Sequence, residues 1–436
     1  MAKGHLNTAI QKSLFLLGAG ASFGTKEKRT GCKMSGEMFD ALQEMLSQPQ
    51  KNGISDVEAK TFRFLLSTLH YQSNWRSLEK NSSFEFKPNI EELALIIRRI
   101  RNRENYLPYP LTGNWADKLI QLESLFAKER ENETELTLFA SLESKLKNEF
   151  LPKWLEISQN SLDYLKPLGD LMGSQYLKDP IECFSLNYDQ TIEQHLREKH
   201  DIQPYCGFVS GEWKGFGAKD IEGFDKLNLL KLHGSLEWIR LTDSGAVKER
   251  DSLKTEEEKD IDERHNPYLI FGHGTKTYSF DPFFGLISNF KETLMSRPYI
   301  FAIGYSFFDP YINNLIIEAL NNNEFHKLII VNPVFGPDVE DGKIQVDKEY
   351  FDYVTNIDGK EASLVLTEYI EEIQKNSFYS ELPEFNIQKI NGSDRIHFMN
   401  IGFDKFLKDY FENDGAKLVE LIDKYEQIRN KEEKPF

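Results

Sequence analysis

Four short segments of the 436-residue chain combine small, polar and ionisable residues, and each follows a run of apolar residues. They are GAGAS at 18–22, NYD at 187–189, HGS at 233–235 and GYS at 304–306. Glycines at a strand end let backbone N–H groups approach a phosphate, while asparagine, aspartate and histidine supply hydrogen bonds and a base near neutral pH. Together these residue types predict a nucleotide site with acid–base chemistry.

Each segment also has a plainer interpretation. Gly18 and Gly20 belong to GAGASFG rather than to the G-x-G-x-x-G pattern of dehydrogenases, so a tight turn explains them about equally well. Asp189 has the residue type and the place of a helix N-cap. His233 has a local rival in His273, which also follows an apolar run and precedes a glycine. Residue types alone leave these alternatives open.

The elements that must position these residues are short apolar runs separated by helical patterns. Such runs predict buried strands, and their alternation with helices predicts an α/β fold with a Rossmann-like, doubly wound parallel sheet. In such sheets ligands bind beyond the carboxyl ends of the strands. The predicted strands are 13–17, 181–186, 227–232, 267–272, 299–304 and 327–332.

The same pass predicts the domain organisation. A large helical insertion interrupts the core, a helical appendage ends the chain, and the almost wholly polar stretch 244–266 is interpreted as a mobile surface excursion. The predicted parts are a first core segment at 1–36, the insertion at 37–165, the remaining core at 166–340 and an acidic helical region at 341–436.

Composition narrows the class of protein. With 53 basic and 70 acidic residues the net charge is −17, which disfavours direct binding to nucleic acid or to an anionic membrane. No run approaches the roughly 18 to 20 apolar residues that span a bilayer, and the first residues lack the apolar core of a signal peptide. The sequence therefore predicts a cytoplasmic globular protein.

In their order along the chain, GAGAS, SLNYD, LHGS, IGYS with a following DP, and VNP resemble the Sir2-like domain of bacterial antiviral NADases. The likeness covers about residues 12–335 and implies that NAD is the substrate. Matched residue by residue, it implies phosphate contacts at Gly18, Ala19, Gly20 and Ser22, reacting ribose and nicotinamide contacts at Asn187 and Asp189, a base at His233, and further NAD contacts at Gly304, Ser306 and Asn332.

Two departures from sirtuins matter. Protein-deacylating sirtuins contain a four-cysteine zinc module, whereas this chain has only Cys32, Cys183 and Cys206, so no zinc is expected. The loop FGTKEKRTGCKMSGEMF also replaces the usual sirtuin run after GAGAS, which leaves the residues that close over nicotinamide unassigned.

The resemblance implies an NAD hydrolase that releases nicotinamide and ADP-ribose and depletes cellular NAD in antiviral defence by abortive infection. The alternatives are an NAD-dependent deacylase or ADP-ribosyltransferase, and a non-catalytic sensor of NAD or ADP-ribose. Unregulated NAD hydrolysis would kill the host cell, so the added helices are expected to serve gating and assembly. The resemblance further implies a homo-oligomer, with a HerA-type ATPase or a phage-derived activator as partner.

Overall fold

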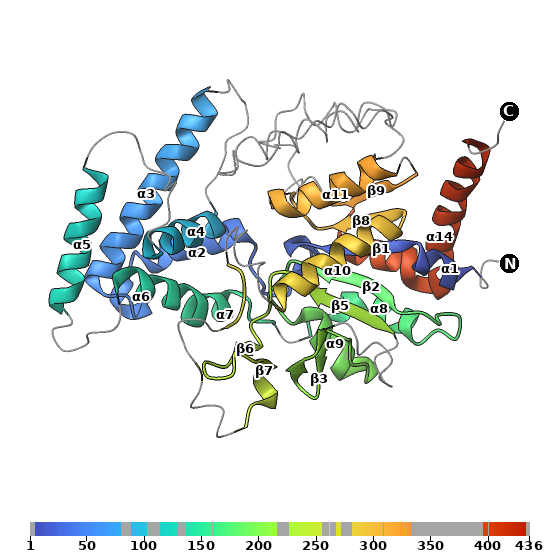
Figure 1. The fold of residues 1–436 in the computed structure, drawn as a ribbon, viewed down its shortest axis with the longest axis horizontal. Coiled ribbons are helices and arrows are strands. Elements are labelled where there is room, and N and C mark those ends of the chain that lie inside the picture. Colours follow the sequence, from blue (N-terminus) through green and yellow to red (C-terminus); the bar gives the residue numbers. More distant parts are fainter. Residues whose placement is uncertain are drawn as a thin grey trace. The chain divides into compact units, whose positions relative to one another are not determined.

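In a computed structural model, drawn as a ribbon in Figure 1, the chain forms two compact units. The first, the sheet unit, comprises Met1–Cys32, Ile157–Ser235 and Thr277–Phe436, and the second comprises Lys33–Glu156 and Leu236–Lys276. The structure describes residues 5–79, 89–102, 114–129, 137–158, 160–215, 226–254, 261, 267–271, 281–307, 309–323, 325–332, 396–399 and 401–432.

The sheet unit is built on six parallel strands in the order β10-β9-β8-β1-β2-β5. Chain order moves outward from β1 to β2 and β5, and then returns to the other side of β1 for the remaining three strands. This is the Rossmann-like, doubly wound topology, and its switch point lies between β1 and β8. The strands are β1 (Ser13–Leu17), β2 (Ile181–Ser185), β5 (Leu227–Lys231), β8 (Tyr299–Ile303), β9 (Lys327–Val331) and β10 (Ile396–Met399).

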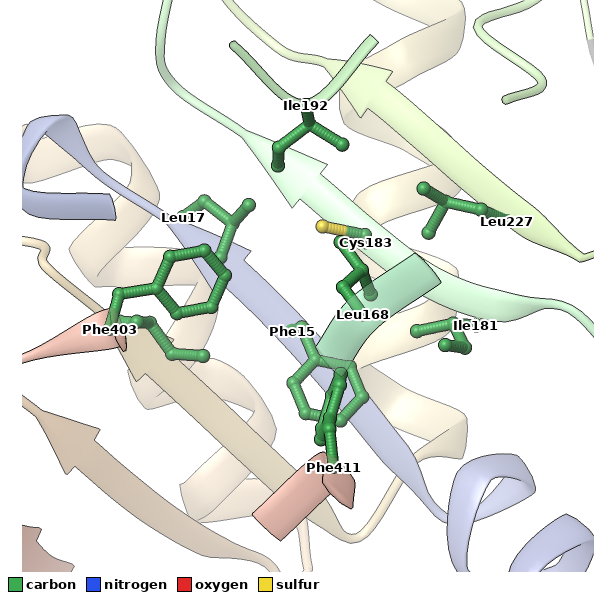
Figure 2. A pocket seen from close by; sticks show the side chains of 10 residues that line it. Phe15, Leu17, Leu168, Ile181, Cys183, Ile192, Leu227, Phe403 and Phe411 are labelled. Atoms are coloured by element: carbon green, nitrogen blue, oxygen red, sulfur yellow. The ribbon is translucent and has the colours of Figure 1, made fainter. Parts of the chain in front are cut away.

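The five strands up to β9 are buried along their whole length, as their continuous apolar runs require. On one face, alternate side chains of β1 and β2, including Phe15 and Cys183, point toward α8, α9 and α14 around an apolar cavity of about 20 Å³ (Figure 2). On the other face, Phe184 packs edge-on against Phe290 of α10 with ring centroids 4.9 Å apart. Helices therefore cover both faces of the sheet.

Helices alternate with the strands of the sheet unit, and a long helix, α14, follows the last strand. This helix packs against α1 and α8 and is broken at Glu412–Gly415, where three residues have positive φ. Because β10 also pairs with β9, the described residues between 396 and 432 form part of the Rossmann-like unit. The helices are α1 (Leu6–Gln11), α8 (Lys166–Met172), α9 (Thr191–His200), α10 (Phe283–Ser296), α11 (Pro310–Asn322) and α14 (Phe403–Glu432).

In the second unit the described residues between 33 and 156 are mostly helical, whereas the helical insertion was predicted for 37–165. Apolar side chains pack these helices together, and α4 is buried at every position from Leu93 to Ile97, that is, all round the helix. A π-helical turn at Lys145–Phe150 joins α6 to α7. The helices are α2 (Ser35–Met45), α3 (Asp56–Glu79), α4 (Ile90–Arg101), α5 (Trp115–Glu129), α6 (Leu138–Ser144) and α7 (Leu151–Trp154).

Two predictions about residues 236–276 are wrong. Part of the polar stretch 244–266 is ordered, because β7 (Val247–Glu249) pairs antiparallel with β6 (Trp238–Arg240) as a hairpin. The apolar run at 267–271 is no strand of the parallel sheet: it belongs to the second unit, where the N–H of Tyr268 donates to the carbonyl of Trp238 at 2.7 Å. Burial explains the apolar residues of this run without a sheet.

In the sheet unit a short hairpin joins β3 (Phe208–Val209) to β4 (Glu212–Trp213). Among the helices of the described residues, none combines the length and the apolar character needed to span a bilayer.

Candidate functional site

The strand register brings the predicted site segments to one edge of the sheet. Leu17 of β1 lies beside Ser185 of β2 and Ile303 of β8, and the same row continues through Lys231 to one side and Val331 to the other. Each of these residues ends its strand. The turns that follow therefore start at the same level, and the carboxyl edge gathers segments that are more than 300 residues apart in sequence, since the row runs from Leu17 to Val331.

The glycines at the switch point let two turns pack in direct backbone contact. A Cβ atom on Gly18 would lie 2.5 Å from the carbonyl oxygen of Gly304, and one on Gly20 would lie 2.8 Å from the Gly304 Cα. Gly304 itself has φ +59°, and its Cβ would lie 2.4 Å from the amide nitrogen of Ala21. Any side chain would separate the turns, so packing explains these glycines directly.

The backbone amides of the two turn glycines already have partners. The N–H of Gly18 donates to the carbonyl of Ile303, and that of Gly20 donates to the carbonyl of Gly304, both at 2.9 Å. Ala19 is exposed at the start of the short 3₁₀ turn, η2, that covers Ala19–Ser22. The turn can therefore approach a phosphate through its exposed backbone, with the glycines holding its shape.

Asn187 follows β2 by two residues and is fixed against the first turn. Its side-chain Nδ2 donates to the carbonyl oxygen of Gly18 and to the hydroxyl oxygen of Ser22, both at 2.9 Å. Since these bonds use both amide hydrogens, the side chain presents its Oδ1 as an acceptor. The structure thus brings together Gly18, Ser22 and Asn187, which the sequence predicted as members of one site.

Asp189 is 5% exposed and its carboxylate faces inward. The Oδ1 atom accepts hydrogen bonds from the backbone N–H and the hydroxyl of Thr191, at 3.0 and 2.7 Å, where α9 begins. Burial, followed by the Asp189 charge, raises the pKa of the Cys32 thiol to about 12 and that of the Tyr164 hydroxyl well above its usual value. The hydrogen bonds of Oδ1 therefore agree with the interpretation that Asp189 stabilises the start of α9.

The backbone carbonyl of Asp189 is also held by a buried side chain. Lys231, at the end of β5, donates to the Asp189 carbonyl and forms an ion pair with Glu193 of α9 at 2.6 Å. Both charged side chains are buried, with 2% and 7% exposed. This pair ties β5 to the start of α9, beneath the edge where Asn187 lies.

His233 lies in the turn after β5, where Gly234 takes φ +81°. Its Nε2 is 3.0 Å from Oδ2 of Asp309, and both residues are buried. Asp309 belongs to the loop after β8, although β1 and β2 lie between β8 and β5 in the sheet. The contact therefore joins two loops that approach each other from the two sides of the switch point.

The remaining predicted residues lie at the same edge with fewer contacts. Ser306 is exposed in the loop after β8. Asn332 follows β9, one strand beyond β8, and its Nδ2 donates to the carbonyl of Tyr305 at 3.4 Å. His273, the rival of His233, lies outside the described residues. Within the predicted set, direct hydrogen bonds join Asn187 to Gly18 and Ser22, and join Gly20 to Gly304.

Asp309 is the residue that the sequence analysis missed. Its signal was present, since an aspartate before a proline at the start of a helical pattern is a typical N-cap, here of α11. Nothing local in the sequence indicates that its second oxygen meets a histidine 76 positions earlier. A second missed contact joins Gln190 and Ser235 at 2.7 Å, linking the turns after β2 and β5.

The three cysteines are buried free thiols. Among the described residues, no group of three or more histidine, cysteine, aspartate or glutamate side chains is arranged to hold a metal ion.

The sequence was compared with models of known protein families. Residues 182–352 match the model of the SIR2-like domain, so the chain contains a SIR2-like domain with a Rossmann-like parallel sheet. The matched range begins in β2 and includes Asn187, His233 and Asp309. A SIR2-like domain implies that NAD is involved. A search of curated proteins gives no match.

Proposed function

We propose that this protein hydrolyses NAD, releasing nicotinamide and ADP-ribose. The observation that supports the proposal best is the contact of Asn187 with the Gly18–Ser22 turn, at the carboxyl edge of a SIR2-like sheet. The glycine turn and the exposed Ala19 suit the phosphates, and Ser306 and Asn332 suit the hydroxyl groups of NAD.

In the proposed reaction the bond between the ribose C1′ and the nicotinamide nitrogen breaks. The electron pair stays on that nitrogen and neutralises the pyridinium ring, a water oxygen bonds to C1′, and the water proton goes to His233. Asn187 Oδ1 would accept a hydrogen bond from the water or from a ribose hydroxyl and so orient it. A positioned base of this kind contributes about 10² to 10⁴ in rate, or about 3 to 5 kcal/mol.

Asp189 has two proposed roles, one for each of its carboxylate oxygens. Because its Oδ1 accepts two hydrogen bonds at the start of α9, the carboxylate holds the Asn187–Thr191 turn in place. Contact of its other oxygen with the nicotinamide carboxamide or with the developing cation is part of the proposal implied by the family resemblance.

The test is incubation of the purified protein with NAD and no protein acceptor, with nicotinamide and ADP-ribose separated by chromatography. Release of both products in equal amounts is expected, and Asn187→Ala should lose it while the exposed Asn148→Ala keeps it. NAD consumption only in the presence of a protein acceptor would indicate a transferase or deacylase. Binding of NAD without product release would indicate a sensor.

The biological role that we propose is antiviral defence in the cytoplasm, in which a triggered homo-oligomer depletes NAD. A HerA-type ATPase or a phage-derived molecule is the proposed trigger. Cellular NAD should fall after phage infection and stay constant when the chain alone is expressed at a low level. Constitutive depletion by the lone chain would contradict this gating.

A further inference from the structure

The contact between His233 and Asp309 has a geometry that determines more than the position of the ring. The Nε2 atom of His233 lies 3.0 Å from Oδ2 of Asp309, and the two residues are 9% and 7% exposed. Within the part of the chain that the structure describes, Nδ1 of His233 forms no hydrogen bond. One ring nitrogen is therefore held by the protein, and the other is left for chemistry.

The second oxygen of Asp309 keeps the carboxylate in place. Oδ1 accepts hydrogen bonds from the backbone N–H groups of Tyr311 and Ile312, at 2.8 and 3.3 Å, at the start of the 13-residue helix α11. Tyr305 and Asn313, joined at 2.8 Å, brace the same loop. Bonds at a helix N-terminus also favour the ionised form of the carboxylate. An ionised carboxylate only accepts hydrogen bonds, so Nε2 of His233 must be the protonated nitrogen.

We propose that Asp309 is a positioning residue that fixes His233 as the Nε2–H tautomer, so that Nδ1 is the atom that takes the proton. This inference rests on the proposed NAD hydrolysis and assigns the atom at which its base acts. When Nδ1 accepts the water proton, the ring becomes an imidazolium, and the Asp309 carboxylate stabilises the positive charge 3.0 Å away.

The competing explanation is that Asp309 only caps α11, and two substitutions separate the explanations. Asp309→Asn retains an Oδ1 for the cap but places an N–H donor opposite Nε2, which forces the hydrogen onto Nδ1 and blocks the base. Asp309→Ser also retains a good cap, because serine is among the preferred N-cap residues, but its shorter side chain leaves His233 without a partner. Thermal melts of both variants should show a single cooperative transition, which establishes that each is folded.

We expect Asp309→Asn to lower the rate of nicotinamide release by about 10² to 10⁴, the size of a lost general base. Asp309→Ser should lose about tenfold to 10², because the ring then samples both tautomers. If both variants hydrolyse NAD at the parent rate, Asp309 is only a cap and the proposal is wrong.

The tautomer itself is measured by long-range ¹H–¹⁵N correlation spectra of protein labelled at the histidine ring nitrogens. His233 is assigned from the signal that disappears in His233→Gln. The parent should show the Nε2–H pattern and Asp309→Asn the Nδ1–H pattern. A parent ring in the Nδ1–H form, or an unchanged pattern in Asp309→Asn, would overturn the proposal. This readout needs no turnover, so failure of the proposed hydrolysis is recognised separately, by absent nicotinamide release from a protein with the expected tautomer.

Discussion

Two buried histidines in the sheet unit have opposite surroundings. His233, at the carboxyl edge, is paired with Asp309, whereas His195 on α9 is 2% exposed and neither of its ring nitrogens has a hydrogen-bond partner among the described residues. Burial and then the neighbouring His200 lower the pKa of His195 to about 4. Burial alone makes an imidazole inert, and a carboxylate partner is what makes it suitable as a base.

The strongest test of the partnered region is Asn187→Ala. The substitution removes both hydrogen bonds to the Gly18–Ser22 turn and the Oδ1 acceptor. NAD cleavage should fall by about 10³-fold or more, whereas the lost hydrogen bonds should cost about 1 kcal/mol in the free energy of unfolding. Nicotinamide release and a urea melt measure the two effects, and a variant that hydrolyses NAD at the parent rate would show that the site assignment is wrong.

His233→Ala tests the base directly and should lower the rate of NAD cleavage by about 10² to 10⁴. His273→Ala should cost about tenfold or less, since only His233 follows SLNYD in the family order. Rates of both variants are compared after a thermal melt has shown that each is folded. A folded, active His233→Ala beside an inactive His273→Ala would transfer the base to His273.

Lys231→Met tests whether the buried ion pair between Lys231 and Glu193 stabilises the fold. The change leaves Glu193 as a buried carboxylate without its ion-pair partner and should lower the free energy of unfolding by about 3 to 5 kcal/mol. The double variant Lys231→Met, Glu193→Leu should recover most of the loss, because apolar side chains replace both charges. Urea melts of the two variants measure this difference, and equal losses in both would show that the pair does not act as a unit.

The smallest expected effect is that of His195→Leu, which replaces the buried histidine whose ring nitrogens have no hydrogen-bond partner among the described residues. The pKa of His195 is lowered from its ordinary value of 6.5 to about 4 in the folded protein. Between these two pH values the unfolded chain therefore binds a proton at His195 and the folded protein does not. Parent stability should therefore fall by up to about 3 kcal/mol as the pH drops from 6.5 to 4.

Leucine at position 195 removes this proton, so the stability of the variant should depend less on pH across that range. Urea melts at pH 7 and pH 5 provide the measurement. NAD cleavage at pH 7.5 should stay at the parent rate, in contrast to that of His233→Ala. An equal pH dependence in parent and variant would show that His195 is not the group responsible.

Most strands were predictable because each is a continuous apolar run bounded by polar residues. The predicted ends of β1, β2, β5, β8 and β9 agree with the structure to within one residue. The four-residue strand β10, IHFM, contains a histidine and is too short for a clear pattern. The run at 267–272 has the same apolar composition as a strand, and composition does not distinguish pairing in a sheet from burial against a hairpin.

Some features of the site follow from the sequence alone, and others follow only from the tertiary structure. The sequence by itself determined which polar residues follow the buried strands and therefore which side chains reach the carboxyl edge, because parallel strands end at one edge of a sheet. The tertiary structure decided which of them meet: Asn187 with the turn at Gly18, and His233 with Asp309 across two intervening strands. Those contacts depend on strand order and loop approach, which arise from the packing of the whole unit and leave no trace in local residue spacing.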